Sequence, residues 1–389
     1  MEGVAESESR VTVTPLELFF DLVFVFAFTQ VTGLMSADLT AEGVVRGMLV
    51  LAALWWAWAA YAWLTNTVDP DEGAERLAVL AVIGALLVLS LAVPDAFGGT
   101  AVLFGVAYFA VRALHIVLYL IAGRDDPELF RAVRRFAPTA TLGPALILVA
   151  AFFDDGAQYA LWAAALAIDY FGALTGRGGG WRVSPHHFAE RHGLIIIIAL
   201  GESVVAIGVG AAGHEVHTGV VVAALLGLTV AAALWWTYFD WVSILAESQL
   251  AHATGVARAA LARDIYSYIH LPMVAGIVLF ALGLKKTIAD FDDPLPTVAA
   301  FALTGGVALY LLAHVGLRLR IHGGLGHGRP VAVLVLVALA PVALAVPALA
   351  ALACVAAVCT ALIVYEVFRY RESRARLRRT REAPDLSAS

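Results

Sequence analysis

The sequence predicts an all-α fold, a polytopic membrane helix bundle of about 12 transmembrane helices arranged as two parallel six-helix repeats. Hydrophobic residues make up 61% of the 389 residues and charged residues only 14%, whereas a soluble domain has roughly 25% charged residues. Apolar segments of about 20 residues, the length of one membrane span, recur along the chain. Short motifs also recur in the same order in its two halves.

Twelve segments are long and apolar enough to be candidate spans. Only the last two are weakly separated, around Val346 and Pro347, and no connecting segment is long enough to form a soluble domain. The candidate spans are about 15–35, 44–66, 75–93, 100–122, 136–153, 157–175, 188–211, 217–243, 262–284, 297–317, 330–346 and 348–368.

The distribution of Lys and Arg residues predicts the orientation of the bundle. If the N-terminus is cytoplasmic and the spans alternate, cytoplasmic segments contain nearly all the basic residues. The exceptions are Arg46, Lys285 and Lys286 in outer loops and Arg112 inside a span. Because cytoplasmic loops carry an excess of Lys and Arg, we expect both termini in the cytoplasm.

An internal duplication is predicted from motifs shared by the two halves. Leu54–Trp56 matches Leu234–Trp236, and Leu114–Leu118 matches Ala313–Leu317. Six spans per half would give both halves the same orientation, as parallel repeats about an axis along the membrane normal. The predicted parts are a cytoplasmic N-terminal segment (1–14), the first repeat (15–175), a cytoplasmic linker (176–187), the second repeat (188–368) and a basic cytoplasmic tail (369–389).

Two predicted spans begin with ionisable side chains that a lipid-facing helix could not retain. Glu17 and Asp21 open the first span and, four residues apart, share one helix face. An ionised group deep in a bilayer costs about 2.5–3.5 kcal/mol on insertion scales, so we expect these groups to face protein or water. The seventh span carries four more such side chains, which are Glu190, Arg191, His192 and Glu202.

A layer of ionisable groups is expected in the cytoplasmic half of the bundle. Asp21 lies roughly 9 Å along its helix from Pro15. Asp169 and Asp240 lie at comparable depth in the sixth and eighth spans, and His115 lies slightly deeper. The layer could be a structural polar network that joins helices, or it could be a path for protons or ions.

Arg112 and Glu202 are expected to pair near the middle of the membrane. Counted from Arg124 and Arg191, both lie roughly 16–18 Å deep. Opposite charges at one depth favour each other, since pairing removes most of the cost of burying either. Such a pair could be a permanent link between the fourth and seventh spans, or it could open for a proton or a substrate.

The sequence offers no clear metal, cofactor or catalytic site. His187, Glu190 and His192 form the densest group of possible ligands, but they lack the His-Glu-x-x-His spacing of zinc-protease helices. A helix start after Ser184 and Pro185 explains them more simply, so neither a metal nor a cofactor is predicted. Walker, flavin and nicotinamide motifs are absent, and no nucleophile stands at a suitable spacing from a base. The sequence therefore favours a protein that is not an enzyme over one that is.

At these positions the chain resembles a known family. Leu16–Phe26, His187–Gly193 and Ala199–Ser203 are similar to motifs of the bacterial low temperature requirement protein A family. The resemblance covers nearly the whole chain and implies a polytopic inner-membrane protein, named for growth in the cold, without an established activity. The resemblance singles out six motif positions but assigns none of them a role. They are Glu17, Asp21, Glu190, Arg191, His192 and Glu202.

Three functions remain open at this stage. Duplication together with buried charge favours an ion- or proton-coupled carrier of a small solute, with a polar layer at the repeat interface. The family name favours a lipid-binding protein or enzyme that adapts the membrane to cold. A structural membrane protein would instead have its charges fully paired in a dry core. The expected partners are membrane lipids and an unknown small solute or ion, with no nucleic acid, in the bacterial inner membrane.

Overall fold

A computed structural model describes residues 12–68, 73–175, 179–212, 215 and 217–371. Within these ranges, one isolated bridge between Pro294 and Pro347 is the only β structure, and the chain is otherwise built of helices and their connections. The predicted all-α class is confirmed. Contacts divide the chain into two compact units, residues 1–202 with 246–275 and residues 203–245 with 276–389. Each unit is described separately.

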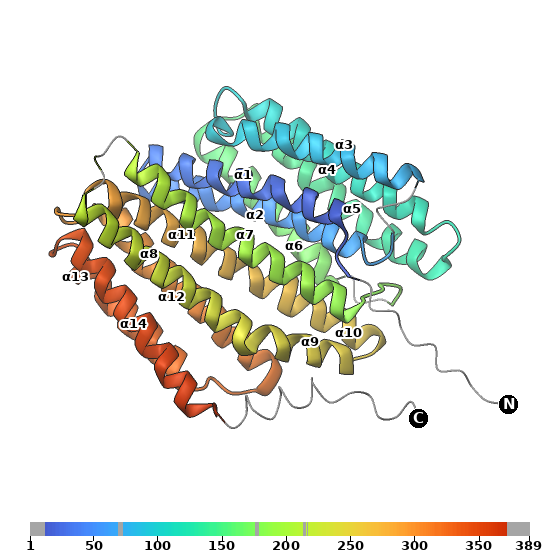
Figure 1. The fold of residues 1–389 in the computed structure, drawn as a ribbon. Coiled ribbons are helices and arrows are strands. Elements are labelled where there is room, and N and C mark those ends of the chain that lie inside the picture. Colours follow the sequence, from blue (N-terminus) through green and yellow to red (C-terminus); the bar gives the residue numbers. More distant parts are fainter. Residues whose placement is uncertain (1–11, 69–72, 176–178, 213–214, 216, 372–389) are drawn as a thin grey trace. The chain divides into compact units, whose positions relative to one another are not determined.

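The first unit contains six complete long helices and the larger part of a seventh (Figure 1). A second segment of chain then adds short helical pieces. Its elements are α1 (Pro15–Ala37), α2 (Ala41–Leu64), α3 (Gly73–Ala92), η1 (Val93–Asp95), α4 (Ala101–Ala122), α5 (Pro127–Ala150), α6 (Asp155–Thr175), α7 (Pro185–Ala211) as far as residue 202, α9 (Ser243–His252) from residue 246, α10 (Gly255–Ala262), η3 (Arg263–Ile269) and the start of α11 (His270–Ala289).

The second unit contains the remaining helices, shown from light green to red in Figure 1. Besides the ends of α7 and α11 and the start of α9, its elements are α8 (Thr218–Thr237), η2 (Tyr238–Val242), α12 (Thr297–His322), α13 (Gly328–Ala343) and α14 (Ala348–Arg369). The weak break expected around Val346 and Pro347 does separate two helices, α13 and α14. The units follow spatial contacts and leave the proposed sequence duplication as a prediction.

The described residues include nine helical segments that are long and apolar enough to cross a membrane. Every predicted span overlaps a helix, but α5, α6 and α13 do not meet the same criterion. The first half of α5 carries Arg131, Arg134 and Arg135, and α13 has only 16 residues. A multi-pass membrane protein is therefore supported, while the number of twelve spans remains a prediction.

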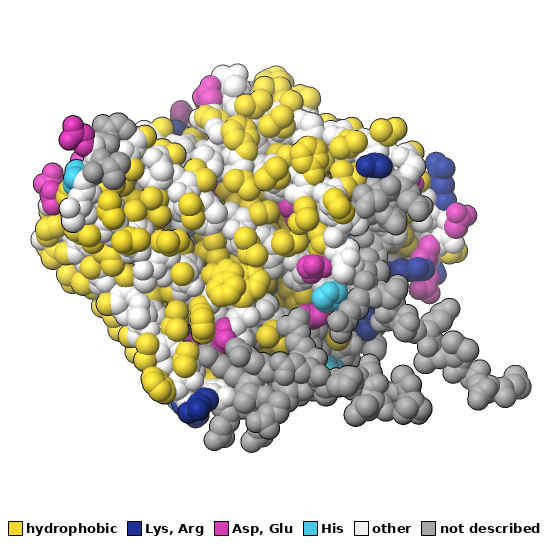
Figure 2. Space-filling model, in the orientation of Figure 1, with side chains coloured by type: hydrophobic (Ala, Val, Ile, Leu, Met, Phe, Trp, Pro, Cys, Tyr) yellow, Lys and Arg dark blue, Asp and Glu magenta, His cyan; other side chains and the backbone are white. Residues whose placement is uncertain are grey.

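Large apolar side chains cover much of the molecular surface, and hydrophobic atoms dominate the face in Figure 2. Leu77, Phe152 and Phe171 of the first unit are 65–71% exposed, and Leu334 and Phe368 of the second are 69% and 77% exposed. In water, apolar surface of this extent would promote aggregation. In a bilayer it is the expected lipid-facing surface.

The start of α1 shows why Glu17 stands where it does. The Thr14 hydroxyl accepts from the Glu17 backbone N–H, and the Thr14 N–H donates to the Glu17 carboxylate at 3.0 Å. This is a capping box, reinforced by Pro15 at the first helical position. Glu17 therefore helps to start its own helix as well as contributing buried charge.

Asp126 caps α5 in the loop after α4. Its carboxylate accepts from the N–H groups of Leu129 and Glu128 at 3.2 and 3.1 Å. These two hydrogen bonds, together with Arg182 at 2.6 Å, favour the charged carboxylate and lower the pKa of Asp126. The cap fixes the first turn of α5, which lies beside the end of α4.

A widened π-helical turn, η3, precedes α11. Pro272 follows it and lacks the N–H that would bond the carbonyl four residues earlier. Such turns often occur at functional sites, because they redirect side chains without ending the helix. In this case η3 carries Arg263 and Ser267, which line the cavity described below.

Close helix crossings and a largely buried ion pair between Arg329 and Glu366 stabilise the core of the second unit. A Cβ added to Gly276 of α11 would lie 2.6 Å from the Gly306 carbonyl oxygen of α12, so only glycine permits this approach. Arg329 donates to both carboxylate oxygens of Glu366, at 2.8 and 3.2 Å, and to the Thr237 carbonyl at 3.0 Å. These bonds link α13, α14 and α8.

Within the first unit, α1 and α7 run parallel. Glu17 contacts Arg191, 174 residues later, and Thr29 contacts Glu202, 173 residues later. A nearly constant offset over twelve residues requires two helices with the same direction. Polar side chains of α1 and α7 therefore bridge the two helices at both levels.

Candidate functional site

The first polar cluster is centred on Arg191 of α7, which lies between the two acids of α1. Its Nη1 donates to Glu17 Oε1 at 2.7 Å, and its Nη2 donates to Asp21 Oδ1 at 2.6 Å. All three side chains are at most 1% exposed. The positions taken from the start of each span thus meet in one buried cluster.

Four further groups complete the coordination of this cluster. His187 Nε2 donates to Glu17 Oε2 at 3.0 Å, and Trp58 Nε1 donates to Asp21 Oδ1 at 2.8 Å. Arg191 also donates to the Thr65 hydroxyl at 3.2 Å. Its guanidinium carbon lies 5.7 Å from the Phe20 ring centre, an additional cation–π contact. The cluster therefore joins α1, α2 and α7.

The formal charges of this cluster do not balance. Glu17 and Asp21 carry two negative charges if ionised, and Arg191 carries one positive charge. A net charge buried away from water is costly, so a neutral cluster requires one additional proton on His187 or on a carboxylate. Within the described part of the chain, Asp21 Oδ2 has no hydrogen-bond partner. This oxygen can hold a proton.

The second buried ion pair joins Arg112 of α4 to Asp169 of α6, with 3.2 Å between Nη2 and Oδ1. Both side chains are 1% exposed. Gly143 of α5 makes room for the carboxylate, since a Cβ there would lie 2.7 Å from Asp169 Cγ. Arg112 Nη1 also points to the Trp56 carbonyl oxygen at 3.4 Å.

The predicted pairing of Arg112 with Glu202 is therefore wrong. Asp169 is the acid that Arg112 contacts, whereas Asp21 contacts Arg191. Depth counted along separate helices places two groups at one level but does not determine which helices are neighbours. Glu202, 2% exposed, instead accepts from the Thr29 hydroxyl at 2.6 Å.

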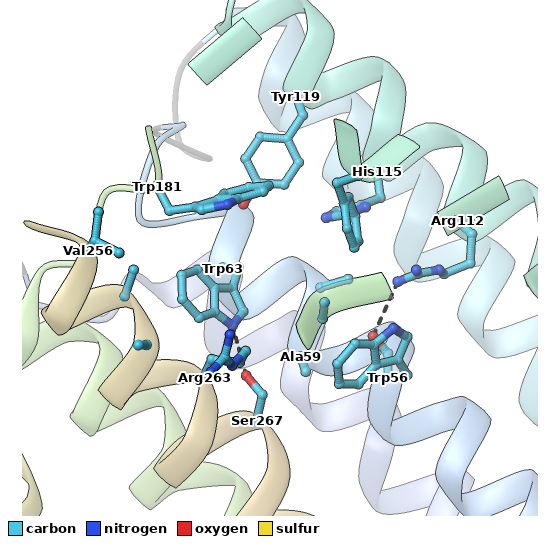
Figure 3. Close-up of a pocket in the computed structure, with 15 residues that line it drawn as sticks. Trp56, Ala59, Trp63, Arg112, His115, Tyr119, Trp181, Val256, Arg263 and Ser267 are labelled. Carbon is cyan, nitrogen blue, oxygen red and sulfur yellow. Dashed lines mark hydrogen bonds between the residues drawn. The ribbon is translucent and has the colours of Figure 1, made fainter. Parts of the chain in front are cut away.

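A cavity of about 310 Å³ lies beside Arg112 in the first unit (Figure 3). Residues of α2, α4, α5, α6, α10 and η3 and of the loop before α7 form its wall. Five aromatic rings, two guanidinium groups and one imidazole dominate the wall. They belong to Trp56, Trp63, Tyr119, Phe136, Trp181, Arg112, Arg263 and His115.

Several polar atoms of this wall are buried without a partner among the described residues. They are Arg112 Nε, Trp56 Nε1, Tyr119 Oη and both ring nitrogens of His115. Buried polar groups almost always form hydrogen bonds in folded proteins. A group of unpaired polar atoms around one cavity therefore indicates a place for water or for a ligand.

Helix α2 separates the cavity from the Arg191 cluster. At about 100° of rotation per residue, Trp56, Ala60 and Trp63 fall on one side of the helix and line the cavity. Trp58 and Thr65 fall on the opposite side and bond to the cluster. A shift or rotation of this one helix would change both sites together.

The other predicted site residues have more varied surroundings. Glu190 accepts from the Val13 N–H at 3.0 Å. His192 is fully buried, and its ring lies 4.8 Å from the ring centre of Trp58. Asp240 belongs to η2 of the second unit. In the described part of the chain, no three His, Cys, Asp or Glu side chains converge as metal ligands.

Sequence reasoning missed most of the cavity wall. No motif drew attention to Arg263, and Trp181 lies in a loop without a helical pattern. The seven-residue spacing of Trp56 and Trp63, with small alanines between them, could have indicated a single aromatic face. Nothing in the sequence placed that face against the end of α4.

Comparison with known proteins identifies relatives over most of the chain. Residues 12–364 match the family model described as bacterial low temperature requirement A protein (LtrA). An uncharacterized protein of Rhizobium meliloti (strain 1021) is 30% identical over 305 residues, which cover 76% of this chain and 74% of that relative. No solved structure matches the chain. The family match confirms the resemblance drawn from the motifs of the first and seventh spans.

Proposed function

The chain belongs to the bacterial low temperature requirement A family and is an integral membrane protein, and we propose that it is a proton-coupled carrier of a small solute. The solute binds in the cavity, and the Arg191 cluster exchanges the coupled proton. Both termini lie in the cytoplasm, and the membrane is the bacterial inner membrane.

One observation carries this proposal, the placement of two sites on opposite faces of α2. Trp56 and Trp63 line the cavity, while Trp58 bonds to Asp21 in the Arg191 cluster. Coupling requires one element with two arrangements that both sites bias. Helix α2 meets the geometric part of that requirement, because it contacts both sites along the same few turns.

The charges of the Arg191 cluster supply the second half of the proposal. Two carboxylates share one guanidinium, so binding or loss of one proton changes the cluster between neutral and negative. In a low-dielectric interior that change is large enough to alter the preferred packing of α2. A structural network with balanced charges would not respond in this way.

The cavity also fits the proposed orientation. It is lined near the carboxyl ends of α2, α4 and α6 and near the amino ends of α5 and α10. In the orientation predicted from the Lys and Arg residues, all these ends face the cytoplasm. The cavity is then the cytoplasm-facing site of a carrier that opens to one side at a time. The parallel α1 and α7 agree with a parallel duplication, which remains part of the proposal.

The proposal is tested with the full-length protein in proteoliposomes that contain a pH-sensitive dye. A panel of small anions, cations and neutral solutes is added outside, and the internal pH is recorded. We expect at least one solute to change the internal pH in proteoliposomes but not in empty liposomes. Asp154→Asn, a change at an exposed loop carboxylate, is the matched control and should behave like the original protein. If no solute gives a pH change or crosses the membrane, the carrier function is wrong.

A further inference from the structure

The charged groups of the cavity wall are all of one sign. Arg112 and Arg263 line the cavity, and no Asp or Glu side chain of the described residues does. Their acidic partners, Asp169 and Asp264, lie outside the wall. The surface that a ligand meets therefore presents guanidinium groups without carboxylates.

The unpartnered polar atoms of the wall are mainly donors. Arg112 Nε and Trp56 Nε1 can only donate, while the Tyr119 hydroxyl and a neutral His115 can each donate one hydrogen bond. Figure 3 shows the Arg112 and His115 side chains on the same side of the cavity, above Trp56. A ligand rich in acceptor atoms would satisfy these groups, whereas an ammonium ligand would compete with them.

The remaining wall consists of aromatic rings. Trp181 meets Tyr119 and Phe136 edge to face, with ring centres 5.4 and 5.9 Å apart, and Trp63 at 6.1 Å. Aromatic walls bind flat apolar bodies by stacking and edge contacts. The volume of about 310 Å³ is at the lower end of small-molecule sites, so the ligand is small.

An aromatic wall alone would also suit a quaternary ammonium ion. The two guanidinium groups decide against that ligand, because they would place like charges inside the same low-dielectric cavity. The planar guanidinium fork of arginine also matches a pair of oxygen atoms on a carboxylate or phosphate group, and a sulfonate presents such a pair too. The charge of the wall and its hydrogen-bond donors therefore both favour an anionic ligand.

We propose that the cavity binds a small organic anion, whose acidic group is attracted by the guanidinium groups of Arg112 and Arg263 and whose flat apolar body lies between Trp63, Trp181 and Tyr119. The inference rests on the proposed carrier function, because it names the class of solute that is carried. Binding itself can be measured without transport, so the two proposals can fail separately.

The binding test uses the full-length protein in lipid nanodiscs and three probes of similar shape. Benzenesulfonate is anionic, benzenesulfonamide is neutral and phenyltrimethylammonium is cationic. Calorimetric titration should show saturable binding of benzenesulfonate, with the neutral probe at least about tenfold weaker, since one charge-assisted hydrogen bond is worth that much. Preferred binding of the cation, or no preference among the three, would overturn the proposal.

Two variants locate the binding site. Arg263→Gln removes one guanidinium from a partly exposed position and should weaken benzenesulfonate binding about tenfold or more. The double variant Arg112→Gln with Asp169→Asn removes the second guanidinium together with its partner, so no unpaired charge remains, and should have a similar effect. Arg131→Gln, on the exposed surface of α5, should bind as the original protein does. Unchanged binding in both cavity variants, with the fold verified by thermal unfolding, would place the anion elsewhere.

Transport of the same probes separates the two proposals. If benzenesulfonate binds in the cavity and no probe crosses proteoliposome membranes, the anion site holds and the carrier function fails. If phenyltrimethylammonium is transported and competes for the cavity, the carrier function holds and the anion class is wrong. If benzenesulfonate is taken up, and this uptake is lost in Arg263→Gln but kept in Arg131→Gln, both the carrier function and the anion site are supported.

Discussion

Removing Arg112 alone is expected to destabilise the protein strongly. Arg112 and Asp169 are each 1% exposed, and 3.2 Å separates their charged atoms. Arg112→Met would leave the Asp169 carboxylate buried without its cation. Breaking a buried ion pair in this way costs about 3–5 kcal/mol. The bond from Arg112 to the Trp56 carbonyl, at 3.4 Å, is long and adds little.

Removing both partners should cost much less than removing one. Arg112→Met combined with Asp169→Leu eliminates both desolvation costs and fills similar volume. Replacement of a buried pair by apolar side chains is often neutral or even stabilising. We therefore expect the double variant to be more stable than either single variant by at least about 2 kcal/mol.

Thermal unfolding in detergent, followed by circular dichroism, measures these differences relative to the original protein. Glu202→Gln is the informative control, because it leaves the ion pair of Arg112 intact and retains an acceptor for the Thr29 hydroxyl. Its cost should be well below that of Arg112→Met. The reasoning would be refuted if the stability lost in the double variant equalled the sum of the losses in the two single variants. It would also be refuted if Glu202→Gln lost as much stability as Arg112→Met.

Three other substitutions test further parts of the structure. Arg191→Met should cost at least as much as Arg112→Met in thermal unfolding, because it leaves two buried carboxylates without their cation; a neutral result would disprove the cluster. Asp126→Ala should lower the melting temperature most at pH values above the ordinary carboxyl pKa. The lowered pKa of Asp126 stabilises the folded state in that range, and this stabilisation is lost as the pH falls through the folded-state pKa. A difference in melting temperature that does not depend on pH would contradict the cap. Gly143→Ala should destabilise by about 1–3 kcal/mol because its Cβ would displace Asp169, whereas Gly84→Ala, with no atom within 4 Å of the added Cβ, should be neutral or slightly stabilising.

The helical class and the approximate helix positions followed from the sequence because apolar length is a local property. The start of α1 at Pro15 and the break before α14 at Ala348 were both readable from capping and proline signals. The number of membrane crossings was less certain. Three helices, α5, α6 and α13, are too short or too polar to qualify as spans by length and hydropathy.

The site was only partly predictable, because the sequence indicated which residues are buried and charged but not which of them are neighbours. The motifs selected Glu17, Asp21 and Arg191, which the structure brings into contact, and their burial as a group follows from the cost of a lone charge in lipid. The partner of Arg112 could not be derived, because Asp169 and Glu202 are both acids on long apolar helices. Only helix packing, with a glycine of α5 opening the space, decides between them.

The most direct test of the account measures proton and solute movement together. Asp21→Asn leaves Arg191 with one carboxylate, so the cluster is neutral without an added proton and the fold should be retained. In proteoliposomes, the original protein should move protons in a fixed ratio to the transported solute. The account predicts that Asp21→Asn still binds and transports the solute but no longer changes the internal pH. An unchanged proton-to-solute ratio in Asp21→Asn, with solute uptake equal to that of the original protein, would contradict it.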